Sequence, residues 1–372
     1  MNKAAHMVEL NPWHKRQAAL IQHFTSLAYL ESILSRAENL IAMADAMLEE
    51  RAHLDSAGIA LANWSQTSTA GHFCVHAYPA LVEFRDGLVE SIALRAYEKF
   101  NVAGENQCSR MLTEYAPSMI WATHEQESAF KAEAESVFRY AGGLSRFTKR
   151  PCVADDLVFW LLWNEGHIDG ARIPRFVVRT DVVARTGEVP PRTGIYVPQG
   201  DAYGALRFAW TGGHGALGSV RSLNEFGEQV LRRVGRQGLW GNAAELYRIL
   251  DENRHLDEWG WSDIKVDTMQ YAAGPLSHEM FTERASEWYL VEPIQGEYEE
   301  IDGSYAGAFS QATRQGRIAA GQSVPTSGWW YSPAAGERRY FKRGDVFPAI
   351  ADSDWGDTFW LWALDQSAPR LG

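Results

Sequence analysis

Apolar residues recur three or four positions apart through a long segment near the start of the chain. A 3.6-residue period places them all on one face of a helix. Asn11 followed by Pro12 has the form of an N-cap with proline in the first turn. The sequence therefore predicts one helix over residues 12–51, whose buried stripe is formed by Leu20, Phe24, Leu27, Leu30, Leu34, Ala37, Ile41, Ala44 and Leu48.

Two further helices are expected before residue 150. A second apolar stripe contains Leu81, Phe84, Leu88, Ile92 and Tyr97. A third helix is expected to begin at Thr123, because Thr123 and Gln126 fit the T-x-x-Q form of a capping box. Gly142 and Gly143 are typical of a helix end, so this helix is expected to stop there. Residues 1–150 are therefore predicted to form a helical bundle-like region.

The pattern changes to short strands and glycine-rich turns after Pro151. Residues 195–197 and 205–210 are predicted to be two strands joined by a turn. Ser222 and Glu225 fit a capping box, which predicts a helix ending near Gly235, and residues 242–253 predict another. Residues 157–163 are too short an apolar run to assign. Aromatic-rich strands are expected at residues 288–291, 329–331, 339–341 and 359–362.

The resulting expectation is an α+β fold. The helical half, residues 1–150, is expected to pack on a strand-rich, mainly antiparallel half, residues 151–372, which carries a Trp-rich strand module near its end. The 372 residues are 46% hydrophobic and 22% charged, as in ordinary globular proteins. No apolar run approaches the roughly 20 residues of a membrane span, so no membrane partner is expected.

The net charge and the cysteine content limit the partners and the cellular compartment that are expected for the chain. The chain has 35 Lys and Arg against 47 Asp and Glu, a net charge of -12. Such an acidic chain does not attract a phosphate backbone through its overall field, so no nucleic-acid partner is expected. Three cysteines without a CxxC pair give no disulfide framework, and no secretory signal is visible at the amino end. The expected location is a reducing cytoplasm.

Motifs that carry catalysis or bind cofactors are not found. A formal G-x-G-x-x-G covers residues 213–218, but the predicted helix start at Ser222 lies beyond its last glycine, so a glycine-rich turn is expected instead of a dinucleotide site. His72, Cys74 and His76 lack the further ligand that a metal site needs. No nucleophile–base motif is visible. We therefore expect no enzyme activity, no cofactor and no metal.

One segment stands out by its charge. Residues 285–313 contain acidic residues interleaved with aromatic ones and no Lys or Arg. The segment is either a solvated acidic loop or a docking surface for a basic partner, with aromatic side chains as anchors. On the docking interpretation, the predicted contact residues are Glu287, Trp288, Glu292, Glu297, Tyr298, Glu299, Glu300 and Asp302.

The C-terminal half resembles a bacterial protein family. The segments that carry the resemblance are residues 327–333 (SGWWYSP), 338–341 (RRYF), 344–346 (GDV) and 354–360 (DWGDTFW), with residues 193–198, 208–212, 224–227 and 235–240 as a second block. Together they look similar to polymorphic-toxin immunity proteins of the types numbered seventy-one and seventy-two. The chain has Phe359-Trp360-Leu361-Trp362 where the family is expected to have Ile-Trp-Gln-Trp, and this departure keeps the strand alternation.

The resemblance implies a protein that binds and neutralises a cognate antibacterial effector toxin. Such toxins are delivered by contact-dependent secretion systems such as type VI, and the expected partner is a toxin with a basic surface. No catalytic residue comes with the resemblance. Whether the chain forms a homo-oligomer is left open. The alternative is a small-molecule or carbohydrate-binding enzyme with a tryptophan-lined cleft.

Overall fold

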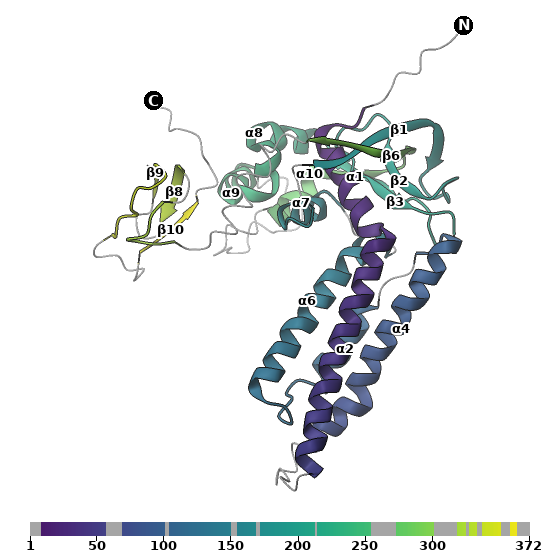
Figure 1. The fold of residues 1–372 in the computed structure, drawn as a ribbon. Coiled ribbons are helices and arrows are strands. Elements are labelled where there is room, and N and C mark those ends of the chain that lie inside the picture. The colour runs from purple at the N-terminus through teal and green to yellow at the C-terminus, as the bar shows by residue number, and fades with distance from the viewer. Residues whose placement is uncertain are drawn as a thin grey trace. The chain divides into compact units, whose positions relative to one another are not determined.

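The structure confirms an α+β fold, with helices mostly in the first half and antiparallel sheets in the second (Figure 1). The computed structural model describes residues 9–56, 69–100, 104–149, 155–168, 172–212, 214–253, 273–300, 318–324, 327–332, 337–350 and 358–362. All statements below concern these residues.

The chain forms two compact units that do not divide at residue 150. The first contains Met1–Phe159, Pro174–Ser222 and Glu283–Tyr298, and the second contains Trp160–Ile173, Leu223–Thr282 and Glu299–Gly372. The expected division into residues 1–150 and 151–372 is therefore wrong. The reason is that the larger sheet packs with the helices that precede it in sequence, so both belong to one unit.

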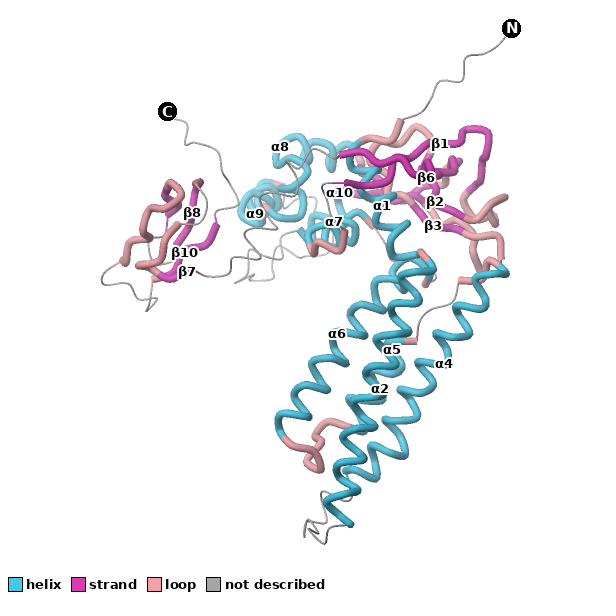
Figure 2. The backbone as a smooth tube through the Cα atoms, viewed as in Figure 1, coloured by secondary structure: helices cyan, strands magenta, loops and turns pink. Residues whose placement is uncertain are grey.

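Long helices form one layer of the first unit. They are α1 (Pro12–Thr25), α2 (Leu27–Ser56), α4 (Tyr78–Leu94), α5 (Glu105–Tyr115) and α6 (His124–Thr148), with a π-helical turn η1 (Phe73–Ala77), a 3-10 turn η2 (Arg95–Tyr97) and the start of α7 (Asp156–Asn164). Helix α2 packs against α4 and α6, and α5 packs against the same two helices (Figure 2). Helix α5 was not expected from the sequence, and the ambiguous run at residues 157–163 is helical.

The predicted helix over residues 12–51 is two helices that meet at Ser26. Ser26 has an extended backbone (φ -65°, ψ 152°). Its hydroxyl accepts a hydrogen bond from the Tyr29 amide at 3.1 Å and donates one to the His23 carbonyl at 2.8 Å. The serine side chain therefore replaces backbone hydrogen bonds that a continuous helix would make, and it caps α2.

The third predicted helix begins as expected and ends later than expected. Thr123 and Gln126 form the full capping box that opens α6. Gly142 and Gly143 do not end the helix, which continues to Thr148. A Cβ at Gly143 would lie 2.5 Å from Phe24 Cε1 and 2.8 Å from the Tyr29 hydroxyl. Gly143 therefore serves the close approach of α6 to α1 and α2.

A four-stranded sheet forms the second layer of the first unit. Its strands are β1 (Arg172–Arg185), β6 (Glu287–Glu300), β2 (Gly194–Pro198) and β3 (Arg207–Ala209), in the order β1-β6-β2-β3. Strand β2 is antiparallel to both neighbours, with Ile195 opposite Phe208 on one side and Val291 on the other. The strands predicted at residues 195–197, 205–210 and 288–291 are confirmed, whereas β1 was not expected.

Buried polar contacts join α1 to the turn between β2 and β3. The Nε2–H of His14 donates to the Gly204 carbonyl at 3.0 Å, and Gln17 Oε1 accepts from the Leu206 amide at 2.9 Å. Both side chains are buried. Asn11 is the N-cap of α1, and its side-chain Nδ2 also donates to the Ala202 carbonyl at 2.9 Å. These bonds satisfy backbone groups of the turn that the helix shields from water.

The second unit contains the rest of α7, three further helices and a smaller sheet among its described residues. The helices are α8 (Glu225–Gly241), α9 (Ala243–Glu252) and α10 (Ala273–Met280). The sheet has the order β7-β10-β8-β9, formed by β7 (Ile318–Ala319), β8 (Gly328–Ser332), β9 (Glu337–Phe341) and β10 (Phe359–Trp362). The chain passes between the units within α7, β1 and β6, and also within β4 (Val220–Leu223) and β5 (Phe281–Arg284). The three predicted aromatic strands of this sheet are confirmed.

The start of α8 differs from the sequence prediction. Its N-cap is Asn224, whose side chain accepts a hydrogen bond from the Gly227 amide at 2.8 Å. Ser222 lies in β4 and donates instead to Asp201. Gly235 has a left-handed backbone (φ 69°) that interrupts the helix without ending it, since the helical segment resumes as far as Gly241. The helix predicted over residues 242–253 is confirmed as α9, with Asn242 as its N-cap.

Asp201 organises the turn that α1 contacts. Its Oδ1 accepts from the Tyr203 and Gly204 amides and from the Ser222 hydroxyl, and its Oδ2 accepts from Arg284 at 2.7 Å. Burial by itself raises the pKa of Asp201, but these donors outweigh it and hold the pKa below its usual value. The charged form of this carboxylate therefore stabilises the fold.

We predict that alanine at Gly143 and alanine at Gly142 have opposite effects on stability. Gly143→Ala forces a Cβ against Phe24 and should lower the free energy of unfolding by ~1–3 kcal/mol. Gly142→Ala meets no atom within 4 Å and should be neutral or raise stability by up to ~1 kcal/mol through helix propensity. Urea unfolding monitored by circular dichroism measures both, and equal stabilities would contradict the tight contact at Gly143.

We also predict a pH-dependent role for Asp201. Because its folded pKa is depressed, its contribution is present above the unfolded pKa of about 3.9 and is lost as pH falls through the folded pKa. Asp201→Asn should cost about 2 kcal/mol at pH 7, and the difference from the wild type should shrink below pH ~4. Urea unfolding from pH 3 to 7 tests this, and a difference that is constant with pH would refute it.

Candidate functional site

Most of the predicted contact residues lie on strand β6. Glu287, Trp288, Glu292, Glu297, Tyr298, Glu299 and Glu300 all fall within β6, while Asp302 lies outside the described residues. The interpretation of this segment as a solvated loop is therefore wrong for residues 287–300. β6 lies between β1 and β2 in the sheet, and its residues 288–291 pair with β2.

Arginines of β1 pair with the acidic residues of β6. Arg185 lies 3.3 Å from Glu287, Arg179 lies 2.8 Å from Glu292, and Arg175 lies 3.0 Å from Glu297. Residue numbers rise along β1 as they fall along β6, which is the order expected of antiparallel neighbours. The acidic stretch has no basic residue of its own, and the adjacent strand supplies the opposite charge.

Glu292 and Arg179 each have a second partner. Glu292 also accepts from Arg192, which precedes β2, at 2.6 Å, and Arg179 also binds Asp181 at 2.7 Å. The hydrogen bonds to Asp181 and then to Glu292 raise the pKa of Arg179, and the bond from Arg179 lowers the pKa of Asp181. We call this surface the arginine–carboxylate face, and it consists of Arg175, Arg179, Asp181, Arg185, Arg192, Glu287, Glu292 and Glu297.

The charges of the arginine–carboxylate face balance, with four arginines and four carboxylates. The repulsion expected among the acidic residues is therefore relieved within the chain for Glu287, Glu292 and Glu297. Glu300 is exposed and Glu299 half-buried, at the end of β6 beyond the last of these pairs. The acidic side chains are therefore paired with arginines along most of the strand.

Trp288 does not belong to an accessible surface. Its side chain is fully buried in a core cluster with Tyr196 and Leu290, and its indole N–H donates to the Thr186 hydroxyl at 3.0 Å. Alternation along the strand points Trp288 away from the side of its neighbour Glu287. The expectation that Trp288 anchors a partner is therefore wrong. Tyr298, by contrast, is 54% exposed.

Solvent reaches most of the arginine–carboxylate face. The side chains of Arg175, Arg185 and Arg192 are 58%, 65% and 51% exposed. Val183, which is 41% exposed, alternates with Asp181 and Arg185 on the same side of β1. Exposed ion pairs add at most about 1 kcal/mol each to stability. A partner can therefore replace these intramolecular pairs at low cost to the fold.

The arginines of this face were not expected as functional residues. Their signal in the sequence is the alternation over residues 172–185, where Arg175, Arg179, Asp181 and Arg185 occupy every second or fourth position. That period of two is typical of a half-exposed strand. Recognising it predicts the strand and its charged side, but the pairing with β6 depends on residues more than a hundred positions away.

The histidine–cysteine cluster at residues 72–76 and the glycine-rich segment near residue 215 make contacts that belong to the fold. No group of three or more His, Cys, Asp or Glu side chains in the described ranges is placed to hold a metal ion. The His76 ring stacks on Tyr115 at 4.4 Å, and Cys74 beside it on η1 is exposed. The Gly215 carbonyl accepts from the Trp210 amide at 3.2 Å, so the glycine-rich segment turns back on β3 before any helix begins. None of the described helices is long and apolar enough to cross a bilayer.

Two cavities lie in the first unit, and neither has a tryptophan in its wall. One, of about 650 Å³, lies between α5 and α6, and the other, of about 620 Å³, lies beside Glu292 between α1 and the sheet. Trp288, Trp330 and Trp360 are fully buried core residues. These described tryptophans therefore do not form the cleft that a carbohydrate-binding enzyme would need.

The chain matches no protein-family model, no curated protein and no solved structure. The resemblance of the C-terminal half to immunity proteins thus depends on the sequence segments quoted above. The geometry that bears on function is that of the arginine–carboxylate face.

Proposed function

We propose that this protein is an immunity protein that binds a cognate antibacterial effector toxin stoichiometrically and thereby neutralises it. The observation that carries the proposal is the arginine–carboxylate face, an exposed array of both charges on a sheet. The resemblance in the C-terminal half supports the same function. On this proposal the protein acts by binding and has no turnover.

The arginine–carboxylate face has properties that suit protein recognition. Seven of its eight charged groups are carried by β1 and β6, which are neighbouring strands of one sheet, so little backbone order has to be gained when a partner binds. Arginine is enriched among the residues that contribute most to protein interfaces. Each exposed pair can exchange its internal partner for an opposite charge on the toxin. Val183 adds apolar contact area.

The net charge of the chain supports a basic toxin as the partner. A charge of -12 attracts a basic surface over distances beyond direct contact and raises the association rate. The balanced face then selects among basic partners, because a partner must present positive groups to Glu287, Glu292 and Glu297 and negative groups to the arginines. We place the protein in the cytoplasm, where it meets toxins delivered by a contact-dependent system such as type VI.

We predict that Arg179→Glu weakens toxin binding and that Arg233→Glu does not. Arg179 pairs with Asp181 and Glu292, and Arg233 pairs with Glu245 and Glu252 on α9, far from the arginine–carboxylate face in sequence. Their side chains are 38% and 42% exposed, and both variants change the net charge equally. Arg179→Glu should raise the dissociation constant about 100-fold.

The proposed function implies that a neighbouring gene encodes the toxin, and the measurement uses the product of that gene. Calorimetry with the purified proteins gives the dissociation constants, and growth of cells that co-express the toxin gives the protection. Wild type and Arg233→Glu should protect, and Arg179→Glu should not. Equal binding by both variants would show that the contact lies elsewhere, while failure of the wild type to bind and protect would refute the proposed function.

A further inference from the structure

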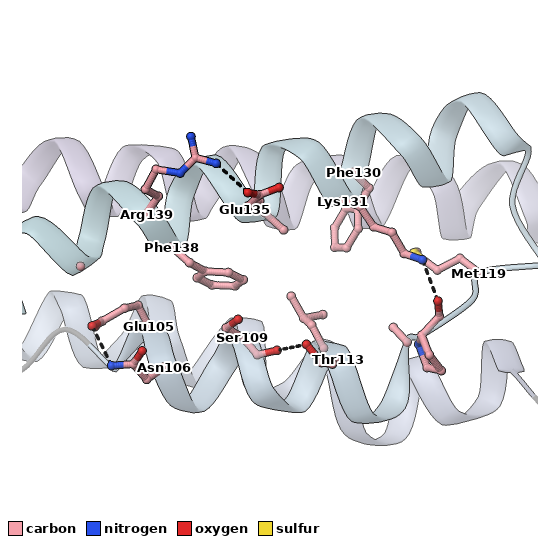
Figure 3. Close-up of a pocket in the computed structure, with 15 residues that line it drawn as sticks. Glu105, Asn106, Ser109, Thr113, Met119, Phe130, Lys131, Glu135, Phe138 and Arg139 are labelled. Carbon is pink, nitrogen blue, oxygen red and sulfur yellow. Dashed lines mark hydrogen bonds and ion pairs between the residues drawn. The ribbon is translucent and has the colours of Figure 1, made fainter. Parts of the chain in front are cut away.

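The cavity between α5 and α6 has an apolar body with a carboxylate at one end (Figure 3). Its volume of about 650 Å³ lies within the range of small-molecule sites. Phe130 and Phe138 project into it from α6, and Ser109 and Thr113 face it from α5. Leu112 and Met119 extend the apolar wall.

Glu105, the first residue of α5, is the carboxylate at that end. The residue is 3% exposed, so its charge has almost no access to water. Its Oε1 accepts a hydrogen bond from the Asn106 side-chain amide at 3.1 Å, whereas its Oε2 has no hydrogen-bond partner among the described residues. A buried carboxylate oxygen without a donor is costly, and a donor entering the cavity would remove that cost.

The basic side chains that line the cavity are already engaged elsewhere. Arg139 pairs with Glu135 at 2.6 Å, and both side chains are more than 70% exposed at the rim. Lys131 binds Glu127 at 2.6 Å and the Pro117 carbonyl at 2.7 Å. No ion pair to Glu105 is found among the described residues, so this end of the cavity favours a cationic ligand and disfavours an anionic one.

We infer that this cavity binds a small organic amine with an apolar or aromatic body. The ammonium group would donate to Glu105 Oε2, and the body would lie between Phe130 and Phe138, whose ring faces also favour a nearby cation. An alcohol of the same shape fills the same space but leaves the carboxylate without an opposite charge. This inference is independent of the proposed toxin binding, because it concerns other residues of the first unit.

The test compares two probes on the full chain by isothermal titration calorimetry. The probes are 4-phenylbutylamine and 4-phenylbutan-1-ol, which differ only in the charged group. The wild type should bind the amine at least about 10-fold more tightly than the alcohol. Glu105→Gln should abolish that preference by weakening amine binding about 10-fold, and Glu135→Gln, at the exposed rim of the same cavity, should keep it.

A thermal unfolding measurement separates binding from misfolding. Without probe, Glu105→Gln should melt at or above the wild-type temperature, because it removes a buried charge that lacks a partner. With the amine, the melting temperature of the wild type and Glu135→Gln should rise, and that of Glu105→Gln should not. Equal binding of both probes by the wild type, undiminished amine binding by Glu105→Gln, or no binding of the amine at millimolar concentration would each overturn the inference.

Discussion

The first unit depends on the buried hydrogen bonds between α1 and the turn that joins β2 to β3. His14 and Gln17 are buried polar residues of α1, and both form hydrogen bonds with backbone groups of that turn. A helix covering these groups with apolar side chains alone would leave a carbonyl and an amide without partners. The bonds therefore fix where the helix crosses the sheet. Through β2 they hold β6 in place, and β6 in turn carries the carboxylates that pair with β1.

Local patterns in the sequence predicted most helices and the aromatic strands, but not every boundary. The capping box at Thr123 was predicted correctly because its two hydrogen bonds join residues three positions apart. Gly143 was misread as a helix end because glycine also permits close packing, and only the position of Phe24 distinguishes the two uses. Ser26 was missed because the apolar stripe continues on both sides of the break, so its period shows no interruption.

Only the acidic half of the arginine–carboxylate face could be predicted from the sequence. The acidic residues of β6 could be identified from charge alone, and three of them do form ion pairs with β1. Their arginine partners could not be identified, because the pairing of β1 with β6 is set by the topology of the sheet and joins residues over a hundred positions apart. Trp288 was assigned to the wrong side because residues 288–291 were predicted to be a strand, but no local pattern shows which side of that strand the sheet buries.

Two glutamates show how differently the fold treats one charge. Glu292 forms ion pairs with two arginines and remains partly exposed, so its charge is balanced by the arginines and solvated by water. Glu105 has neither, since it is buried and one of its oxygens has no donor in the described chain. Apolar side chains cannot supply the hydrogen bonds that a carboxylate in a cavity needs. Where such a carboxylate has no function, replacing it does not lower the stability of the fold. The contrast distinguishes a surface whose charges are poised to exchange partners from a cavity whose charge still lacks one.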